Sequence, residues 1–252
     1  MCKLKSAIIL KDRIFMPDYD SHSKMLDELG ITDDYFNASK VFVRAELSPK
    51  NEDVFSDIDG WEFSVDQDIT PEWFDEKDCA ERMRKAVKEW AKTHIFVGRN
   101  ELKISHGENI FIKDCEDVDI CGSATVKNIC GSATVESIYG NATVEYIYDS
   151  ATVKSICDNA TVEYIYGNAT VKYIYDSATV KYIYDSATVE SICGSATVES
   201  IYDNATVISS PYIKWNNSAS LIIADNATFK DCYSKTIYQA GGWKLVQVKK
   251  GK

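Results

Sequence analysis

The chain has 252 residues, of which 45% are hydrophobic and 27% charged, a balance that is ordinary for a soluble globular protein. Its formal net charge of −11 disfavours direct binding of nucleic acid, because contacts to phosphate groups need an excess of lysine and arginine. The same charge permits an acidic surface that meets a basic partner.

Apolar runs in the sequence are short. None approaches the roughly 18 residues that cross a bilayer, so we expect no membrane association. The run at residues 7–10 is too short for a signal peptide, which predicts a cytoplasmic protein.

Eight cysteines are present, and none belongs to a CxxC pair. Four of them occupy a repeat position that they share with tyrosine, namely Cys121, Cys130, Cys157 and Cys193. This interchange favours reduced thiols over a disulfide framework or a zinc site. We therefore predict no metal ion and no other cofactor.

Residues 1–104 are predicted to form a small α+β domain. Two apolar runs at residues 7–10 and 13–16 indicate a hairpin, and Ser21 or Ser23 can cap a short helix that Gly30 ends. Alternation over residues 41–47 predicts a strand, with residues 61–65 as its partner.

The clearest predicted helix follows Thr70-Pro71, a cap residue with proline at the first turn. It is expected to run to about His94. Its apolar positions recur at helical spacing and form the expected buried stripe: Ala80, Met83, Val87, Trp90 and Ala91.

A nine-residue repeat dominates the rest of the chain. Ten copies of Ala-Thr-Val follow each other at intervals of nine, from Ala124 to Ala205, within the phrase Gly/Asp-Ser/Asn-Ala-Thr-Val-x-x-Ile-Tyr/Cys. Degenerate copies precede them at residues 114–120 and follow them at residues 225–233. A short fixed period rich in β-branched residues predicts a β-solenoid, with Ala, Val and Ile inside and Gly/Asp-Ser/Asn at the turns.

The number of residues per coil follows from charge. Nine residues are too few to enclose a core, so a coil holds either two copies or three. Residues stacked in neighbouring coils lie about 4.8 Å apart, where like charges repel. An 18-residue coil pairs opposite charges at five of seven Lys/Glu contacts, whereas a 27-residue coil does so at only two of six. We therefore predict 18 residues per coil and five coils from the ten copies.

The predicted fold is thus mainly β: a parallel β-solenoid at residues 105–233, preceded by the α+β domain. Residues 234–252 are expected to close it as a C-terminal hairpin and tail, with the hairpin formed by residues 236–238 and 241–246.

The Ser-Ala-Thr-Val-x-x-Ile-Tyr phrases resemble the repeats of proteins from gut bacteria and their phages. In those proteins a similar leader precedes a tandem array of variable length. The leader phrases that carry this resemblance lie at residues 5–13, 66–74 and 86–92. The resemblance covers nearly the whole chain and implies no particular activity. The Gly-Gly-x-Gly-x-Asp pattern of calcium-binding nonapeptides is absent, so no calcium ladder is expected.

Candidate catalytic or metal sites are few, because the chain has only three histidines. The stretch Asp18-Tyr19-Asp20-Ser21-His22 could form a metal or acid/base cluster, but we interpret it as a polar loop that caps the first helix. Arg44 and Glu46 share one face of their strand, and we interpret them as residues that pair with a neighbouring strand. We therefore predict no catalytic residue and no enzymatic activity.

The outward threonine columns raise the possibility of ice binding. We reject it because the neighbouring Lys/Glu column interrupts the flat, uncharged lattice that ice binding requires.

With an 18-residue coil, tyrosines gather on one face, and exposed aromatic side chains favour interfaces. The predicted binding residues are Tyr146, Tyr148, Tyr164, Tyr166, Tyr182 and Tyr184. These rings could instead serve only to cover the corner of the solenoid.

The leading hypothesis is a phage or prophage binding protein that blocks a host or defence protein with its repetitive surface. Two alternatives stay open: capture of a small ligand such as a nucleotide where the leader meets the first coil, and end-to-end architectural assembly.

Overall fold

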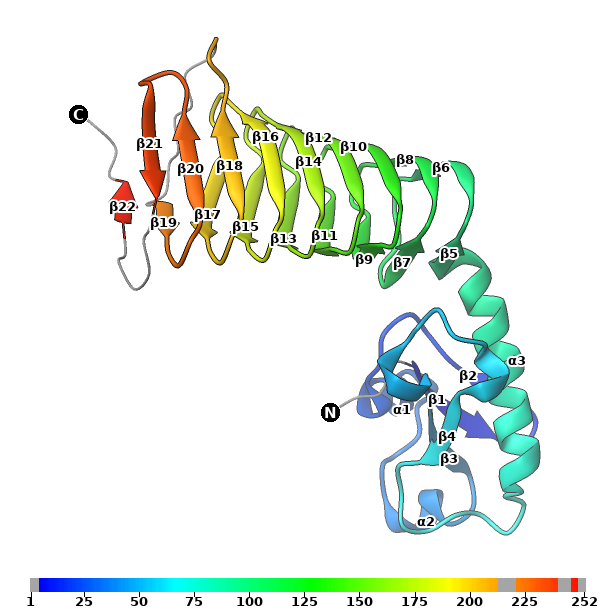
Figure 1. Ribbon diagram of the computed structural model, residues 1–252. Coiled ribbons are helices and arrows are strands. Elements are labelled where there is room, and N and C mark those ends of the chain that lie inside the picture. Colours follow the sequence, from blue (N-terminus) through cyan, green and yellow to red (C-terminus); the bar gives the residue numbers. More distant parts are fainter. Residues whose placement is uncertain (1–4, 213–220, 240–245, 249–252) are drawn as a thin grey trace. The chain divides into compact units, whose positions relative to one another are not determined.

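The computed structural model describes residues 5–212, 221–239 and 246–248 (Figure 1). The chain divides into two compact units, residues 1–95 and 96–252. Within the described residues, no helix is long and apolar enough to cross a membrane.

The first unit is built on a four-stranded antiparallel sheet with the order β2-β1-β3-β4. Its strands are β1 (Lys5–Leu10), β2 (Ile14–Phe15), β3 (Phe42–Ser48) and β4 (Glu62–Val65). Its helices are α1 (His22–Leu29), α2 (Tyr35–Ala38) and α3 (Glu76–His94), with 3₁₀ turns η1 (Lys50–Glu52) and η2 (Ile58–Gly60).

Alternation along β3 gives the sheet two apolar faces. Phe42 clusters with Met25 and Leu26 of α1, whereas Val43, Ala45 and Leu47 are buried on the opposite side of the strand. The long helix α3 contacts β1, β2 and β3. The sheet is therefore covered by helices, which is the layered α+β arrangement predicted for this part of the chain.

The predicted hairpin and first helix are confirmed. β1 pairs with β2 in antiparallel register. The hydroxyl of Ser21 caps α1 by accepting a hydrogen bond from the Lys24 backbone N–H at 3.4 Å. Gly30 ends the helix in the left-handed conformation, with φ of 66°.

The predicted start of the long helix at Thr70-Pro71 is wrong. α3 begins five residues later, with Asp75 as its N-cap. The Asp75 carboxylate accepts a hydrogen bond of 2.8 Å from the Asp78 backbone N–H, and Glu76 and Asp78 add negative charge to the first turn. The predicted buried stripe of α3 is otherwise present, with Cys79 as an additional buried residue and Ala91 only half-buried.

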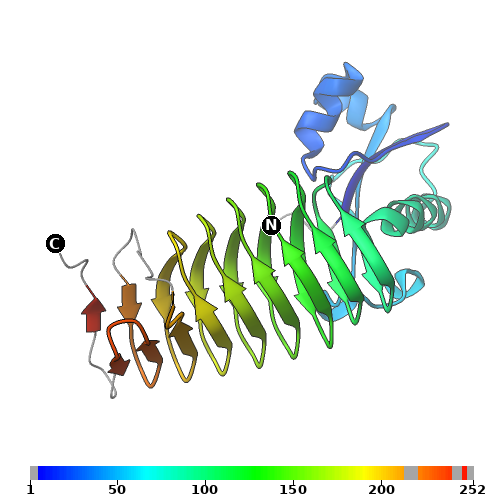
Figure 2. The ribbon, with the colours of Figure 1, turned by 90° about the horizontal axis from the view of Figure 1, so that it is seen from above.

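The second unit contains two sheets of nine strands each within the described residues (Figures 1 and 2). The strands of the first solenoid sheet are β5 (Ile95–Val97), β7 (Ile110–Lys113), β9 (Thr125–Cys130), β11 (Thr143–Ile147), β13 (Thr161–Ile165), β15 (Thr179–Ile183), β17 (Thr197–Ile201), β19 (Leu221–Ile223) and β22 (Val246–Val248). The strands of the second solenoid sheet are β6 (Asn100–Ile104), β8 (Glu116–Ile120), β10 (Thr134–Ile138), β12 (Thr152–Ile156), β14 (Thr170–Ile174), β16 (Thr188–Ile192), β18 (Thr206–Ser209), β20 (Thr228–Asp231) and β21 (Thr236–Gln239).

Successive nonapeptides lie on opposite sheets, so each strand pairs in parallel with the strand two copies away. Thr143 pairs with Thr161 and Ile147 with Ile165, a separation of 18 residues in each case. The predicted parallel solenoid with two nonapeptides per coil is confirmed. It has about seven turns, because the diverged segments before Ala124 and after Ala205 also form coil strands.

The core of the solenoid is thin and repetitive. The Ala, Val and Ile of every complete repeat are fully buried, and they form one continuous cluster along the stack. Each Gly/Asp position adopts the left-handed conformation, for example Gly140 with φ of 71° and Asp158 with φ of 56°. Only Gly and Asp occur at this position of the ten repeats, because these residues tolerate positive φ better than most others.

The C-terminal end differs from the predicted hairpin in its pairing. β21 folds back on β20, and β22 pairs antiparallel with β19 on the other sheet. The two strands therefore close one sheet each instead of pairing with each other. Part of the predicted hairpin, including Trp243, lies outside the described residues.

Candidate functional site

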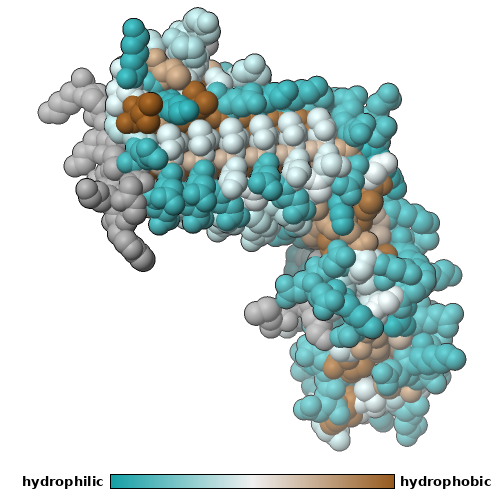
Figure 3. Space-filling view, viewed as in Figure 1, coloured by the Kyte–Doolittle hydropathy of each residue, from teal (hydrophilic) through white to brown (hydrophobic). Residues whose placement is uncertain are grey.

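The outward positions of the repeat create the candidate site. Between the inward Val and Ile, two consecutive residues face away from the core, such as Glu145 and Tyr146 on β11. Because coils stack in register, each outward position becomes a column that runs along the solenoid (Figure 3). The sequence therefore determines the surface column by column.

The six predicted tyrosines lie together, in two adjacent columns that we call the tyrosine ladder. One column occupies β11, β13 and β15 of the first solenoid sheet, and the other follows directly after these strands at the corner. The ladder consists of Tyr146, Tyr164 and Tyr182 in the strand column and Tyr148, Tyr166 and Tyr184 in the corner column.

The rings of the ladder stack within each column. The ring centroids of Tyr146 and Tyr164 are 5.2 Å apart, and those of Tyr166 and Tyr184 are 5.0 Å apart with planes at 1°. Between the columns the rings meet edge to face, at 6.3 Å for the Tyr146–Tyr166 pair. Both arrangements are favourable for aromatic quadrupoles.

This packing decides which atoms the ladder presents. All six tyrosines are half-buried, and Tyr164 and Tyr166 each have a stacked ring on both faces. Their exposed parts are therefore ring edges and hydroxyl groups. Ligands that bind by stacking on an aromatic face, as unstacked nucleic-acid bases do, find no free face on these two rings.

Four of the six ladder tyrosines have raised pKa values. Burial raises the pKa of Tyr166 to about 12 and the pKa of Tyr148 well above its ordinary value. Burial also raises the pKa values of Tyr146 and Tyr184. At neutral pH these groups are therefore neutral and able both to donate and to accept hydrogen bonds.

Ion pairs flank the strand column of the ladder. Lys127 binds Glu145, and Lys181 binds Glu163, in each case between neighbouring coils of the first sheet. On the second sheet, Lys154 binds Glu136 in the same way. These contacts follow the charge pattern that predicted the coil length, and they neutralise much of the charge beside the tyrosines.

Acidic side chains border the corner column. Asp149 and Asp185 occupy the left-handed turn position directly after Tyr148 and Tyr184 of the ladder. Asp203 occupies the same position one coil further on, after Tyr202, and all three aspartates are exposed. The Asp149 and Asp185 carboxylates accept hydrogen bonds of 3.1 Å from the backbone N–H groups of Gly131 and Gly167 one coil away. These bonds hold negative charge in a row along the ladder.

The opposite sheet has a different surface. The position equivalent to the strand column carries Ser137, Ser155 and Ser191, with the single exposed Tyr173 between the last two. Its corner column alternates cysteine with tyrosine: Cys121, Tyr139, Cys157, Tyr175 and Cys193. The cysteines of the described residues are free thiols, as the repeat pattern predicted.

The polar stretch at residues 18–22 caps α1 as predicted, but its residues have separate partners. Lys5, which is buried, donates a hydrogen bond of 2.7 Å to the Pro17 carbonyl and lies 3.6 Å from Asp20. Asp18 lies 3.4 Å from His94 Nε2. The stretch is therefore not a single metal or acid/base cluster.

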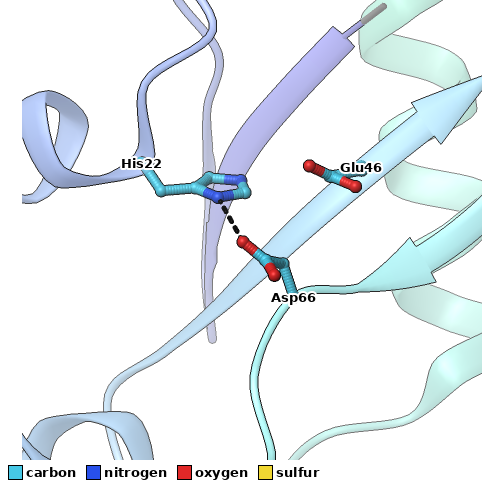
Figure 4. A group of neighbouring side chains, drawn as sticks. All are labelled: His22, Glu46 and Asp66. Carbon is cyan, nitrogen blue, oxygen red and sulfur yellow. Dashed lines mark hydrogen bonds and ion pairs between the residues drawn. The ribbon is translucent and has the colours of Figure 1, made fainter. Parts of the chain in front are cut away.

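A group that the sequence did not indicate forms around His22 (Figure 4). Its Nδ1 lies 3.2 Å from Asp66 Oδ2, and Glu46 of β3 lies beside both. Arg44, for which the sequence predicts cross-strand pairing, instead forms an ion pair with Asp33, which lies in the loop before α2. The three residues come from distant segments, so no local motif could have revealed the group.

The chain was also compared with known proteins. No protein-family model, curated protein or solved structure matches it.

Proposed function

We propose that this protein is a non-enzymatic binding protein whose tyrosine ladder docks onto a basic surface or segment of a partner protein. The observation that carries the proposal is the ladder itself: six half-buried tyrosines, stacked in two columns on one face of a regular solenoid. Tyrosine contributes large contact area with little loss of side-chain entropy, which favours protein interfaces.

The chemistry of the exposed atoms supports a protein partner. The ring edges carry the positive end of the aromatic quadrupole and the neutral hydroxyls can donate, so both suit the backbone carbonyl oxygens of a partner and not its cationic groups. The acidic row at Asp149, Asp185 and Asp203 lies directly beside the corner column and complements lysine or arginine. The net charge of −11 acts in the same direction over longer distances.

Other residues at the strand column support a role for tyrosine beyond folding. Ser200 occupies the same column directly after Tyr182, and their strands pair in regular register. Asn128 fills the corresponding position before Tyr146. Because the solenoid continues through both, the accumulation of tyrosine between them calls for a reason other than the fold.

The proposal also retains the expectation, carried by the sequence resemblance alone, that the partner is a host or defence protein that this chain blocks. Affinity capture from host cells, with a ladder variant as control, tests that part.

The decisive experiment selects peptides from a random displayed library against the immobilised protein. The test variant carries Tyr146→Ser, Tyr164→Ser and Tyr182→Ser, and the matched control carries Tyr173→Ser on the opposite sheet. Serine occurs naturally at this repeat position, so both proteins should keep the solenoid circular-dichroism spectrum.

We expect the selected peptides to be rich in lysine and arginine. They should bind the wild-type protein and the control equally and the triple variant at least about tenfold more weakly, as expected when several interface aromatics are truncated. Equal binding to all three proteins would show that the ladder is only structural.

The two alternatives from the sequence stay predictions. Thermal shift against a nucleotide panel tests capture of a small ligand, and light scattering over a range of concentrations tests end-to-end assembly.

A further inference from the structure

Three potential metal ligands converge in the first unit. His22 is the first residue of α1, Glu46 lies on β3, and Asp66 directly follows β4. One ligand atom from each lies within 4.8 Å of the other two, and Figure 4 shows the three side chains pointing toward a common space. Three separate elements therefore meet at this point.

The surroundings of the His22 ring indicate what belongs in that space. Nε2 lies 3.3 Å from the backbone carbonyl oxygen of Ala45, which can only accept a hydrogen bond. Nδ1 lies 3.2 Å from Asp66 Oδ2, also an acceptor when the carboxylate is ionised. A neutral imidazole has one N–H, so it can satisfy only one of these two contacts.

A cation bound to Nδ1 resolves this conflict. The Nε2–H then donates to Ala45, and the Nδ1 lone pair points at the ion together with the carboxylates. Donation from the second ring nitrogen to a backbone carbonyl is the usual way in which proteins orient a metal-binding histidine. The ring is well placed for this role, because the His22 side chain is only 11% exposed.

We propose that His22 Nδ1, Glu46 and Asp66 bind a divalent transition-metal ion of the zinc or manganese class. One nitrogen and two carboxylate ligands suit such ions, and they leave coordination positions for water. Water can reach these positions because the Asp66 side chain is 63% exposed. Asp66 also lines an open hollow with Asp34, Asp68 and the Asp33–Arg44 ion pair, and the excess of carboxylates there favours the approach of a cation.

Neighbouring charged groups are already engaged. Asp20 accepts a hydrogen bond from the Ser6 backbone N–H and forms an ion pair with Lys5, and Arg44 is held by Asp33. The group of Cys157, Asp158 and Asp176 in the solenoid also has converging ligand atoms, but both of its aspartates are exposed turn residues. That second group serves as the comparison in the test.

The ion would hold the start of α1 against β3 and the end of β4. Binding to the folded state alone should raise the melting temperature of the first unit, by mass action. This effect is separate from the tyrosine ladder and does not depend on the function proposed for it.

The probe is Mn²⁺ alone, titrated into the full-length protein and followed by loss of the electron paramagnetic resonance signal of the free ion. Thiolates select softer ions, so Mn²⁺ minimises binding at the cysteines. The test variants are Glu46→Gln and Asp66→Asn, each of which keeps the side-chain size. The matched control is Asp158→Asn.

We expect one Mn²⁺ to bind the wild-type protein and the Asp158→Asn control with equal affinity. Each test variant should bind at least about tenfold more weakly, since lost metal contacts typically have such effects. The ion should raise the melting temperature of the wild type and the control only.

Three results would overturn the proposal. One is no binding of Mn²⁺ by the wild type. Another is equal binding by all four proteins, which marks adventitious association with surface carboxylates. The third is loss of binding only in Asp158→Asn, which moves the site to the solenoid.

Discussion

The two sheets of the solenoid have the same interior and different exteriors. On both, Ala, Val and Ile are fully buried and the turn residue is left-handed. Outside, the first sheet carries a stacked tyrosine ladder, whereas the second carries mostly serine with an alternating Cys/Tyr corner. The fold therefore depends on the inward and turn positions, and the outward positions vary independently of it.

Substitutions in the core should cause the largest losses of stability. These losses should be equal on the two sheets, because the interior is the same. Ile165→Ala on β13 and Ile174→Ala on β14 each remove a fully buried side chain, and each should lower the free energy of unfolding by about 2–5 kcal/mol. Denaturant titration of the two variants checks this. A difference of more than about 1 kcal/mol would show that the two halves of a coil are not equivalent inside.

Alkaline pH should weaken the ladder. Below a pH of about 10 tyrosines are protonated in both the folded and the unfolded chain, so the contribution of Tyr166 to the free energy of unfolding is fully present. Above it, the unfolded chain loses protons that folded Tyr166 retains until pH about 12, so stability falls as pH rises through this window. Absorbance at 295 nm and thermal melting from pH 8 to 12 measure both events.

The second sheet supplies the control for this titration. The pKa of Tyr175 is raised first by its hydrogen bond with Cys157, and burial adds to that effect. Cys157→Ala should therefore lower the pKa of Tyr175 and leave the late ionisation of Tyr166 unchanged. If both change together, the two corners are coupled through the core.

Substitutions of single tyrosines should lower the free energy of unfolding by different amounts on the two sheets. Tyr164→Ser removes a half-buried ring with two stacked neighbours and should cost about 1–3 kcal/mol, since each aromatic pair contributes about 0.5–1.5 kcal/mol beyond its buried area. Tyr173→Ser removes a ring that is 54% exposed and lies between serines, so its effect should be within about 0.5 kcal/mol. Unfolding midpoints of the pair test this, and equal effects would contradict the distinction between the faces.

The smallest effects should come from the charge columns. Lys181→Glu places a third glutamate between Glu163 and Glu199 and should cost up to about 1 kcal/mol at low salt. Lys172→Glu faces Lys154 and Glu190, so it exchanges one opposite-charge contact for another and should cost almost nothing. Melting in low and high salt separates the two, because the Lys181 effect should shrink as salt screens it.

Much of the solenoid could be predicted because residues that are one coil length apart in the sequence become neighbours in the stack. The Lys/Glu pattern identified the 18-residue coil, since a wrong coil length would have stacked like charges. The coils at both ends of the solenoid were harder to predict. Residues 95–113 form coil strands although they lack the Ala-Thr-Val phrase, because Ile110 and Ile112 supply the buried positions without it.

The first unit shows where local reading fails. Thr70-Pro71 has the composition of a helix start, but the Asp75 carboxylate caps α3 instead, and a sequence with two suitable caps does not show which is used. The group at His22 is even harder to predict from local sequence patterns. It brings together residues 22, 46 and 66 only through the pairing of β3 with β4 and the packing of α1.

Nonapeptides alternate between the two sheets, so the sheet on which a repeat lies depends on whether an even or an odd number of repeats precedes it. Gain or loss of two repeats would leave every later side chain on its own face. Gain or loss of one repeat would move every later strand to the opposite sheet, without disturbing the Ala-Val-Ile interior. Such a change inside the ladder would divide it between the two sheets of a molecule that still folds. An array that changes length by duplication can therefore keep this surface only if it gains or loses an even number of repeats.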